Sequence, residues 1–400
     1  MEEKKNGNKD IFSTGDVIAV STAHGLHDTY QAFLPSYIPL FIENLALTKT
    51  QAGELSAYGQ LPSLVQPFIG FLADRKGLRW VVIIAPAVTA ITSSLLGIMP
   101  NAVLIALLLV LMGFSSAGMH SVGPVIAGRL SGKQLGKGMS YWMVAGELGR
   151  ALGPLVVVTA IKFFGVGGTP WLLSAGLLVS VLLYFRLRRL PEKAHAPAAR
   201  FEWKSALKSM APFMTGIALI TATAFFMVSG ISTFLPTYLT ENGLSLWLAG
   251  ASLTLFQLAG VAGVMVVGPV SDRLGRKPVL ITAIILGPLF TLLFLFGPTW
   301  LQVAGLILMG FSLLSINPVL MAWVQERFSE YRAFANGIYM AMNFIFRSGV
   351  VVIIGWMADR FGLHTSYLVC AGVMLLALPV LVFMPETRQP TTPSQSTPLS

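Results

Sequence analysis

The chain has 400 residues, of which 54% are hydrophobic and 11% are charged, and its formal net charge is +10 at pH 7. A soluble domain carries about 25% charged residues, so this composition excludes an ordinary soluble globule and indicates a polytopic membrane protein. Ten-residue segments of alternating polarity, which a transmembrane β-barrel requires, do not occur, so we expect an all-α membrane protein.

Apolar runs follow one another along the chain, and each has the length of about 20 residues that a membrane-spanning helix requires. The first run is too long and too polar for a cleaved signal peptide, so we expect it to remain as the first spanning helix. The twelve predicted transmembrane helices cover residues 17–42, 50–73, 79–99, 102–127, 137–164, 169–188, 209–238, 246–270, 278–297, 299–325, 332–357 and 364–384.

Short patterns in the first six helices return in the last six. Phe-Leu-Pro at 33–35 returns at 234–236, and Gly-Phe-Ser at 113–115 returns at 310–312. Such internal repeats predict two pseudo-symmetric six-helix bundles with the binding site between them. The predicted parts are a cytoplasmic N-terminal tail (1–16), a first bundle (17–189), a cytoplasmic linker (190–208), a second bundle (209–384) and a disordered C-terminal tail (385–400).

The positive charge is distributed unevenly between the two sides of the predicted membrane. If both termini are cytoplasmic, 22 of the 27 Lys and Arg residues fall in cytoplasmic tails and loops. Basic loops stay in the cytoplasm, so this bias predicts that both termini are cytoplasmic. Because topology accounts for the net charge, we expect membrane lipid and no nucleic acid among the partners.

The first predicted helix carries a polar stripe formed by His24, His27, Asp28 and Gln31. Their spacing places them on one helix face. Histidine titrates near physiological pH, and a desolvated aspartate can titrate there too, so we interpret His24, His27 and Asp28 as groups that take up and release a proton. The alternative is a hydrogen-bond network that only packs this helix against its neighbours.

The fifth predicted helix contains Glu147 and Arg150, which are three positions apart and can pair. A charge inside a membrane costs about 2.5–3.5 kcal/mol, so such residues are functional candidates. We assign Glu147 to proton coupling and Arg150 to the substrate, with a self-neutralised structural pair as the alternative. Glycines at 146, 149 and 153 allow another helix to approach closely.

The eleventh predicted helix contains Asn343 and Arg347, without an acidic residue at helical spacing. Arginine presents a planar fork that suits carboxylates and phosphates, so Arg150 and Arg347 could bracket an anionic substrate. The alternative is an ion pair of Arg347 with Asp28 or Glu147. The remaining candidate substrate-binding residues are polar groups of helices 1, 4, 10 and 11: Gln31, His120, Asn317 and Asn343.

Two related charged loops, residues 70–79 and 268–277, each separate one apolar run from the next. Both resemble the loop between helices 2 and 3 of major facilitator transporters, Gly-x-Leu-Ala-Asp-Arg-x-Gly-Arg-Arg, although Leu78 stands where a basic residue is usual. The resemblance implies the major facilitator fold and a gating role for these loops. The predicted gating residues are Asp74, Arg75, Arg79, Asp272, Arg273 and Arg276.

The first half is similar to the fosmidomycin-resistance family of bacterial efflux proteins. The chain departs from that family at Ser121 and Val122, where Pro and Glu are usual, and at Glu147 and Arg150, where uncharged polar residues are usual. The matching residues are His24-x-x-x-Asp28-x-x-Gln31, Pro39-Leu40, Thr50-Gln51-x-Gly53, Gln66-Pro67-x-x-Gly70, His120 and Gly146-x-x-Gly149-x-x-x-Gly153-Pro154.

This resemblance implies a proton-coupled efflux antiporter of a bacterial inner membrane, which works by alternating access and uses the proton gradient without a cofactor. We expect a monomer whose substrate is an organic anion or an amphiphilic drug. One alternative is a symporter or exchanger for a carboxylate or organophosphate, and another is a non-transporting sensor or scaffold on the same fold. We expect neither an enzyme nor a metal centre, because no nucleophile–base set or ligand cluster stands out and Cys370 is the sole cysteine.

Overall fold

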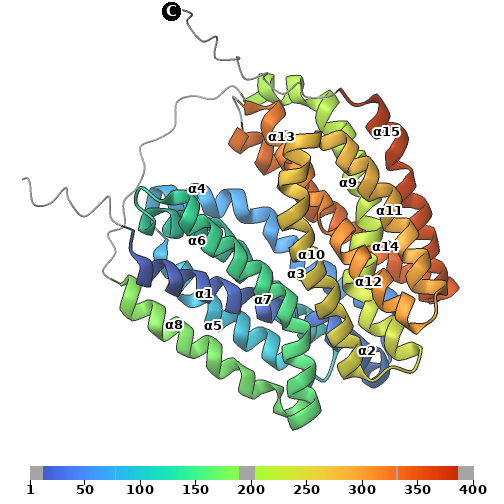
Figure 1. The fold of residues 1–400 in the computed structure, drawn as a ribbon. Coiled ribbons are helices and arrows are strands. Elements are labelled where there is room, and N and C mark those ends of the chain that lie inside the picture. The colour runs from blue at the N-terminus through green and yellow to red at the C-terminus, as the bar shows by residue number, and fades with distance from the viewer. Residues whose placement is uncertain (1–11, 77, 189–202, 330–331, 386–400) are drawn as a thin grey trace, which may run out of the picture.

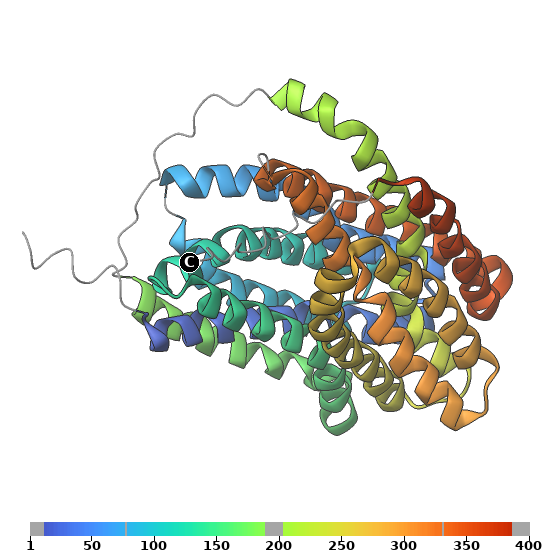
Figure 2. The same cartoon turned by 45° about the horizontal axis from the view of Figure 1, so that its top comes forward.

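The computed structural model describes residues 12–76, 78–188, 203–329 and 332–385, and these residues form helices joined by short turns. Figures 1 and 2 show two groups of helices side by side, α1 to α8 in blue to green and α9 to α15 in yellow-green to red. The predicted all-α fold is therefore confirmed. The first group contains α1 (Thr14–Gln31), α2 (Leu34–Leu45), α3 (Lys49–Gln60), η2 (Leu61–Val65), α4 (Gln66–Lys76), α5 (Arg79–Leu95), η3 (Leu96–Ile98), α6 (Ala102–Leu130), α7 (Leu135–Phe164), η4 (Val166–Leu172) and α8 (Leu173–Leu187). The second group contains α9 (Trp203–Glu241), α10 (Leu246–Leu274), α11 (Arg276–Phe296), α12 (Thr299–Leu313), α13 (Ile316–Arg327), α14 (Arg332–Leu375) and α15 (Ala377–Phe383).

Prolines divide two of the predicted helices, and the predicted helices 50–73 and 364–384 are also interrupted, by η2 and at Leu376. The segment 17–42 consists of α1 and α2, because Pro35 lacks an N–H and its ring would clash with the carbonyl of Gln31, where α1 ends. The segment 299–325 consists of α12 and α13, and Pro318 stands in the same relation to Leu314. The predicted continuity of these two helices was wrong, whereas their positions were right.

The last two predicted helices are separated by a single glycine. Helix α14 spans residues 332–375, and only Gly362 leaves the helical conformation, with φ 77° and ψ 161°. A positive φ suits glycine because it has no Cβ. At the other end of this half, α9 begins at Trp203, inside the predicted linker. Most of that linker and of the two predicted tails lies outside the described residues.

Nine stretches of the described residues are long and apolar enough to cross a membrane. The interrupted stretches α1–α2 and α3–α4 fall outside this group, and the stretch Phe334–Phe383 contains the last two predicted helices on either side of Gly362. These additions account for the twelve predicted segments.

Matching side-chain contacts support the internal repeat. Ser115 of α6 donates a hydrogen bond to the carbonyl of Ala85 at 3.0 Å, and Ser312 of α12 donates one to the carbonyl of Ala283 at 3.1 Å. Each bond joins corresponding helices of its own half. The two halves therefore repeat this hydrogen bond as well as their sequence patterns.

The two halves share one hydrophobic core. One continuous buried cluster contains Tyr37 from the first half together with Phe234 and Val351 from the second. A second cluster, which includes Val17 and Trp142, belongs to the first half alone. Helix pairs α2 and α9, α3 and α14, and α7 and α10 provide the contacts between the halves.

Candidate functional site

Helices α1 and α7 cross at a set of glycines. A Cβ added to Gly149 would lie 1.9 Å from the carbonyl oxygen of Gly25, and one added to Gly153 would lie 2.3 Å from that of Thr29. Larger side chains would separate the helices. The prediction that glycines of the fifth helix admit a neighbouring helix is confirmed, and the neighbour is α1. This crossing brings the polar face of α1 against the charged residues of α7.

Asp28, Glu147 and Arg150 form a cluster that we call the charged group, and Asp28 lies at its centre. Its side chain is only 1% exposed, and Arg150 Nη2 donates a hydrogen bond to its Oδ2 at 2.9 Å. Arg150 Nη1 donates to Glu147 Oε1 at 3.1 Å, so the predicted Glu147–Arg150 pair is present. The guanidinium therefore bridges the buried carboxylate of Asp28 and the half-exposed carboxylate of Glu147. Because Arg150 also binds Asp28 of α1, the Glu147–Arg150 pair is not a self-neutralised pair within α7.

Two histidines flank the carboxylate of Asp28. His24 Nε2 lies 3.5 Å from Oδ2, His120 Nε2 lies 3.4 Å from Oδ1, and the two Nε2 atoms are 3.4 Å apart. The ring of His24 stacks on the indole of Trp142, with the ring centroids 3.8 Å apart. The sequence suggested separate roles for His24 and His120, whereas the structure places both in one cluster.

His27 and Gln31 belong to a different hydrogen-bond network. Nε2 of His27 lies 2.6 Å from Nε2 of Gln31, and Nδ1 of His27 lies 3.0 Å from Oγ1 of Thr89. Thr89 in turn donates to Ser115 at 2.9 Å. The polar stripe of the first helix therefore divides into a charged part and an uncharged part. The sequence did not indicate a role for Thr89 or Ser115, because they lie on α5 and α6 and His27 lies on α1.

Arg347 of α14 faces the charged group from the second half, since it interacts electrostatically with Arg150 and Glu147. Its guanidinium has no ion pair with Asp28 or Glu147 in the described part of the chain. The amide of Asn343, one turn earlier, is buried and has no hydrogen-bond partner among the described residues. These two side chains therefore have unused hydrogen-bonding capacity. By contrast, Asn317 accepts a hydrogen bond from Tyr339.

The ligand atoms of His24, Asp28 and His120 lie within 4.8 Å of one another, a spacing that one metal ion could bridge. The guanidinium of Arg150 already binds the same carboxylate, and its positive charge opposes a divalent cation at this point. A divalent cation is therefore disfavoured at this point.

The structure describes more side chains of the second predicted gating loop than of the first. In the second loop Arg276 forms ion pairs with Asp272 and with Glu326 of α13, whereas Arg273 is exposed. Glu326 was not predicted, because it lies 50 residues from Arg276. In the first loop Arg79 lies over the ring of Trp80. The side chains of Asp74 and Arg75 lie outside the described part of the chain.

A contact between the halves caps the N-terminus of α3. The first N–H groups of a helix have no partner within it. Thr48 accepts a hydrogen bond from the N–H of Gln51 at 3.1 Å, and Asp359 of α14 accepts from Lys49 N at 2.7 Å and from Thr50 N at 2.9 Å. A carboxylate of one half therefore completes the cap of a helix in the other half.

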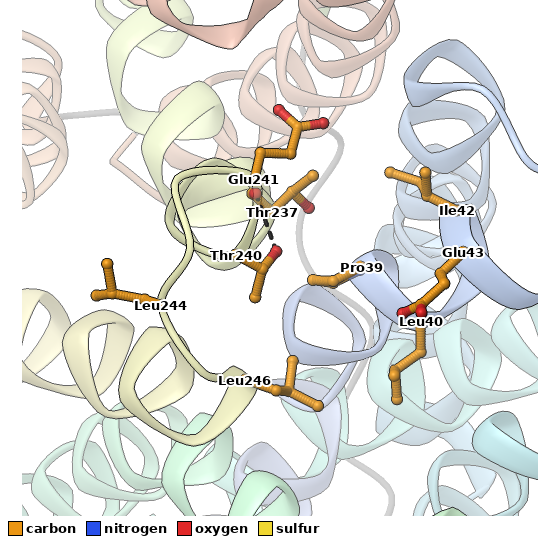
Figure 3. Close-up of a pocket in the computed structure, with 9 residues that line it drawn as sticks. All are labelled: Pro39, Leu40, Ile42, Glu43, Thr237, Thr240, Glu241, Leu244 and Leu246. Atoms are coloured by element: carbon orange, nitrogen blue, oxygen red, sulfur yellow. Dashed lines mark hydrogen bonds between the residues drawn. The ribbon is translucent and has the colours of Figure 1, made fainter.

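An ion pair and a pocket lie beside this cap. Lys49 Nζ is 2.7 Å from Glu241 at the end of α9. Glu241 also lines a pocket of about 390 Å³ between α2 and α9 (Figure 3). Pro39, Leu40 and Glu43 line it from the first half. The lining includes none of the candidate site residues, so we interpret this pocket as part of the junction between the halves.

We expect Asp359→Asn to loosen this junction. The substitution removes the negative charge that faces the first N–H groups of α3, and a charge at a helix N-terminus contributes about 0.3–1 kcal/mol. Spin labels at the exposed positions Asn44 and Asn242 should report a longer or broader distance distribution. Arg360→Ala is the matched control, because Arg360 stacks on Trp356 within its own half. An unchanged distance in Asp359→Asn would contradict a role of this cap in joining the halves.

Comparisons with known proteins show the family to which the chain is similar. A family model described as Major Facilitator Superfamily matches residues 20–264 and 217–399. The fosmidomycin resistance protein of Escherichia coli (strain K12) is 28% identical over 384 residues, which cover 94% of each chain. The multidrug efflux pump Tap of Mycolicibacterium fortuitum is 26% identical over 363 residues, which cover 83% of this chain and 86% of that protein. The crystal structure of the nucleoside transporter NupG matches with a TM-score of 0.74 at 17% identity, over 93% of this chain and 98% of that one, which supports the fold alone.

Proposed function

Because the chain belongs to the Major Facilitator Superfamily, and is therefore a multi-pass membrane transporter rather than an enzyme, we propose that it is a proton-coupled efflux antiporter. Its substrate is an organic anion or an amphiphilic drug. The relatives named for fosmidomycin resistance and for multidrug efflux support export as the direction. The proton gradient supplies the energy, and no cofactor is needed.

The observation that carries this proposal is the ion pair between the buried Asp28 and the half-exposed Arg150 at the crossing of α1 and α7. Ionisable groups inside a membrane are costly and mark ion or substrate pathways. The neighbouring His24 and His120 place two imidazole rings, the side-chain group best suited to take up and release a proton, beside this carboxylate. Uptake of a proton here changes the charge that Arg150 and Glu147 present to the substrate, which couples the two events.

The substrate binds between Arg150 of the first half and Arg347 of the second. Arg347 lacks an ion-pair partner among the carboxylates of the charged group, so an anionic group can supply the missing charge. The buried amide of Asn343 can donate and accept hydrogen bonds beside it. Binding at the junction of two repeated halves is the usual arrangement in transporters built from internal repeats.

The cap formed by Asp359 and the ion pair of Lys49 with Glu241 hold one end of the molecule closed. The positive-inside bias assigns this end to the extracytoplasmic side of a bacterial inner membrane, with both termini in the cytoplasm. Breaking these contacts while the charged loops at the other end close gives alternating access. One chain contains both halves and the whole site, so the monomer is the working unit.

A symporter for a carboxylate or an organophosphate is the second candidate, and charge balance favours it. The formal charges of Asp28, Glu147, Arg150 and Arg347 sum to zero. A monoanion that enters together with one proton keeps this sum at zero, which lowers the cost of closing the loaded site off from water on both sides. Direction must therefore be measured.

Proteoliposomes with an imposed pH gradient test this proposal. The probes are fosmidomycin, a simple carboxylate and an organophosphate, each followed as uptake into the lumen. Antiport predicts uptake into vesicles with an acidic lumen, whereas symport predicts uptake into vesicles with an alkaline lumen, and a protonophore should abolish either. The absence of uptake under both gradients would favour a sensor or scaffold. Vesicles without protein are the control.

A further inference from the structure

The hydrogen bonds around the three histidines of the first half determine which ring nitrogens carry no hydrogen. Nδ1 of His24 lies 2.9 Å from the carbonyl oxygen of Trp142, and Nδ1 of His120 lies 3.0 Å from that of Ser116. A carbonyl oxygen only accepts, so each Nδ1 carries a hydrogen. In the neutral rings both Nε2 atoms are therefore bare lone pairs, and they face each other at 3.4 Å.

The carboxylate between these rings also lacks a donor. Oδ1 of Asp28 is buried and has no hydrogen-bond partner among the described residues, although Nε2 of His120 is 3.4 Å away. A buried acceptor without a donor is costly. A proton on either Nε2 would supply a donor to the other Nε2 or to Asp28. Three acceptors thus converge on a space that one proton can satisfy.

A second proton is opposed by the surrounding charges. Two imidazolium rings would place two N–H groups and two positive charges against each other across 3.4 Å. Arg150 and Arg347 add positive charge from α7 and α14, and only Asp28 and Glu147 offset it. The first proton therefore disfavours the second.

His27 is excluded by a directed chain of hydrogen bonds. Ser115 donates to the carbonyl of Ala85, and Thr89 donates to Ser115, so the single hydroxyl hydrogen of each is already used. Nδ1 of His27 must then donate to Thr89. Its Nε2 then accepts from the amide of Gln31 at 2.6 Å, and a proton there would require that amide to turn its oxygen toward the ring.

We infer that this cluster binds one proton, shared by Nε2 of His24 and Nε2 of His120 beside Asp28, and that His27 is a neutral positioning residue. The inference rests on the proposed proton coupling and specifies its stoichiometry as one proton per cycle. His27 holds α1 against α5 and α6 through Thr89 and Ser115, and it also binds the amide of Gln31. The sequence-based assignments of His27 to proton coupling and of Gln31 to substrate binding are replaced by this role.

Counting protons tests the inference without a substrate. Purified full-length protein in nanodiscs is titrated between about pH 5 and about pH 8, the range of histidine, and each variant is compared with the unmodified chain. The variant His24→Asn combined with His120→Asn should bind one proton fewer, and His27→Asn should bind the same number. His364→Asn, which removes a histidine outside the cluster, is the control for the substitution itself.

Loss of two protons in the double variant, no loss at all, or a loss in His27→Asn would each overturn the inference. Where a variant fails to fold, ring-nitrogen NMR of histidine-labelled unmodified protein gives the answer. It should show a neutral ring with Nδ1 protonated that persists through the titration, and two imidazolium signals from the cluster would contradict the sharing. Failure of the proposed antiport would instead appear in the proteoliposome assay, which is independent of this count.

Discussion

Asp28→Asn is expected to abolish uptake driven by a pH gradient while substrate binding persists. The amide can still accept the hydrogen bond that Arg150 donates at 2.9 Å, but it no longer carries the negative charge that attracts a proton to His24 and His120. Removing one partner of a buried pair costs about 3–5 kcal/mol. We expect a smaller loss of stability here, because Glu147 remains bound to Arg150.

The measurements are uptake into proteoliposomes, thermal unfolding and equilibrium binding of the transported probe. Asp16→Asn is the matched control, because Asp16 lies on the same helix and accepts a hydrogen bond from Arg186 at 3.2 Å in an exposed ion pair. Exposed pairs contribute about 0–1 kcal/mol, so this variant should transport normally. If Asp28→Asn kept its response to the pH gradient, the carboxylate would have no part in coupling.

The sequence predicts the position of each helix better than its continuity. Apolar runs are long and local, so each predicted segment has a helical counterpart in the described residues. The breaks depend on single residues. Pro35 and Pro318 divide helices that hydropathy alone makes continuous, although the proline rule could have indicated both breaks. Gly362 makes a turn that a longer loop was expected to provide.

The sequence also predicts which residues are unusual, but not which of them meet. The cost of charge in a membrane singles out Asp28 and Arg150, and their ion pair is present. Their contact spans 122 residues, so nothing local could reveal it. The same limit hid the cap that Asp359 provides for α3, across 310 residues. Trp142 lies 118 residues from His24, so nothing local indicated that its carbonyl oxygen accepts the hydrogen of His24 Nδ1.

Arg347→Ala is expected to weaken binding of an anionic probe much more than that of a neutral one. A hydrogen bond to a charged group contributes about 1.5–3 kcal/mol, so affinity should fall about 10- to 100-fold. Arg347 lies on α14, faces Arg150 and Glu147 across the junction of the halves, and forms no ion pair with either acidic residue of the charged group. The protein therefore loses little when its guanidinium is removed, whereas an anion loses its fork of donors.

Arg347→Lys separates the charge from the fork. Lysine keeps the positive charge but offers a compact ammonium, so it should restore part of the affinity for a carboxylate. Arg360→Ala removes another arginine of α14, one that stacks on Trp356, and should leave anion binding unchanged. Equal loss of anionic and neutral probes in Arg347→Ala, with a lowered Tm, would mean that Arg347 stabilises the helix packing and does not bind substrate. Selective loss that lysine partly restores would place the anion at the junction between the halves.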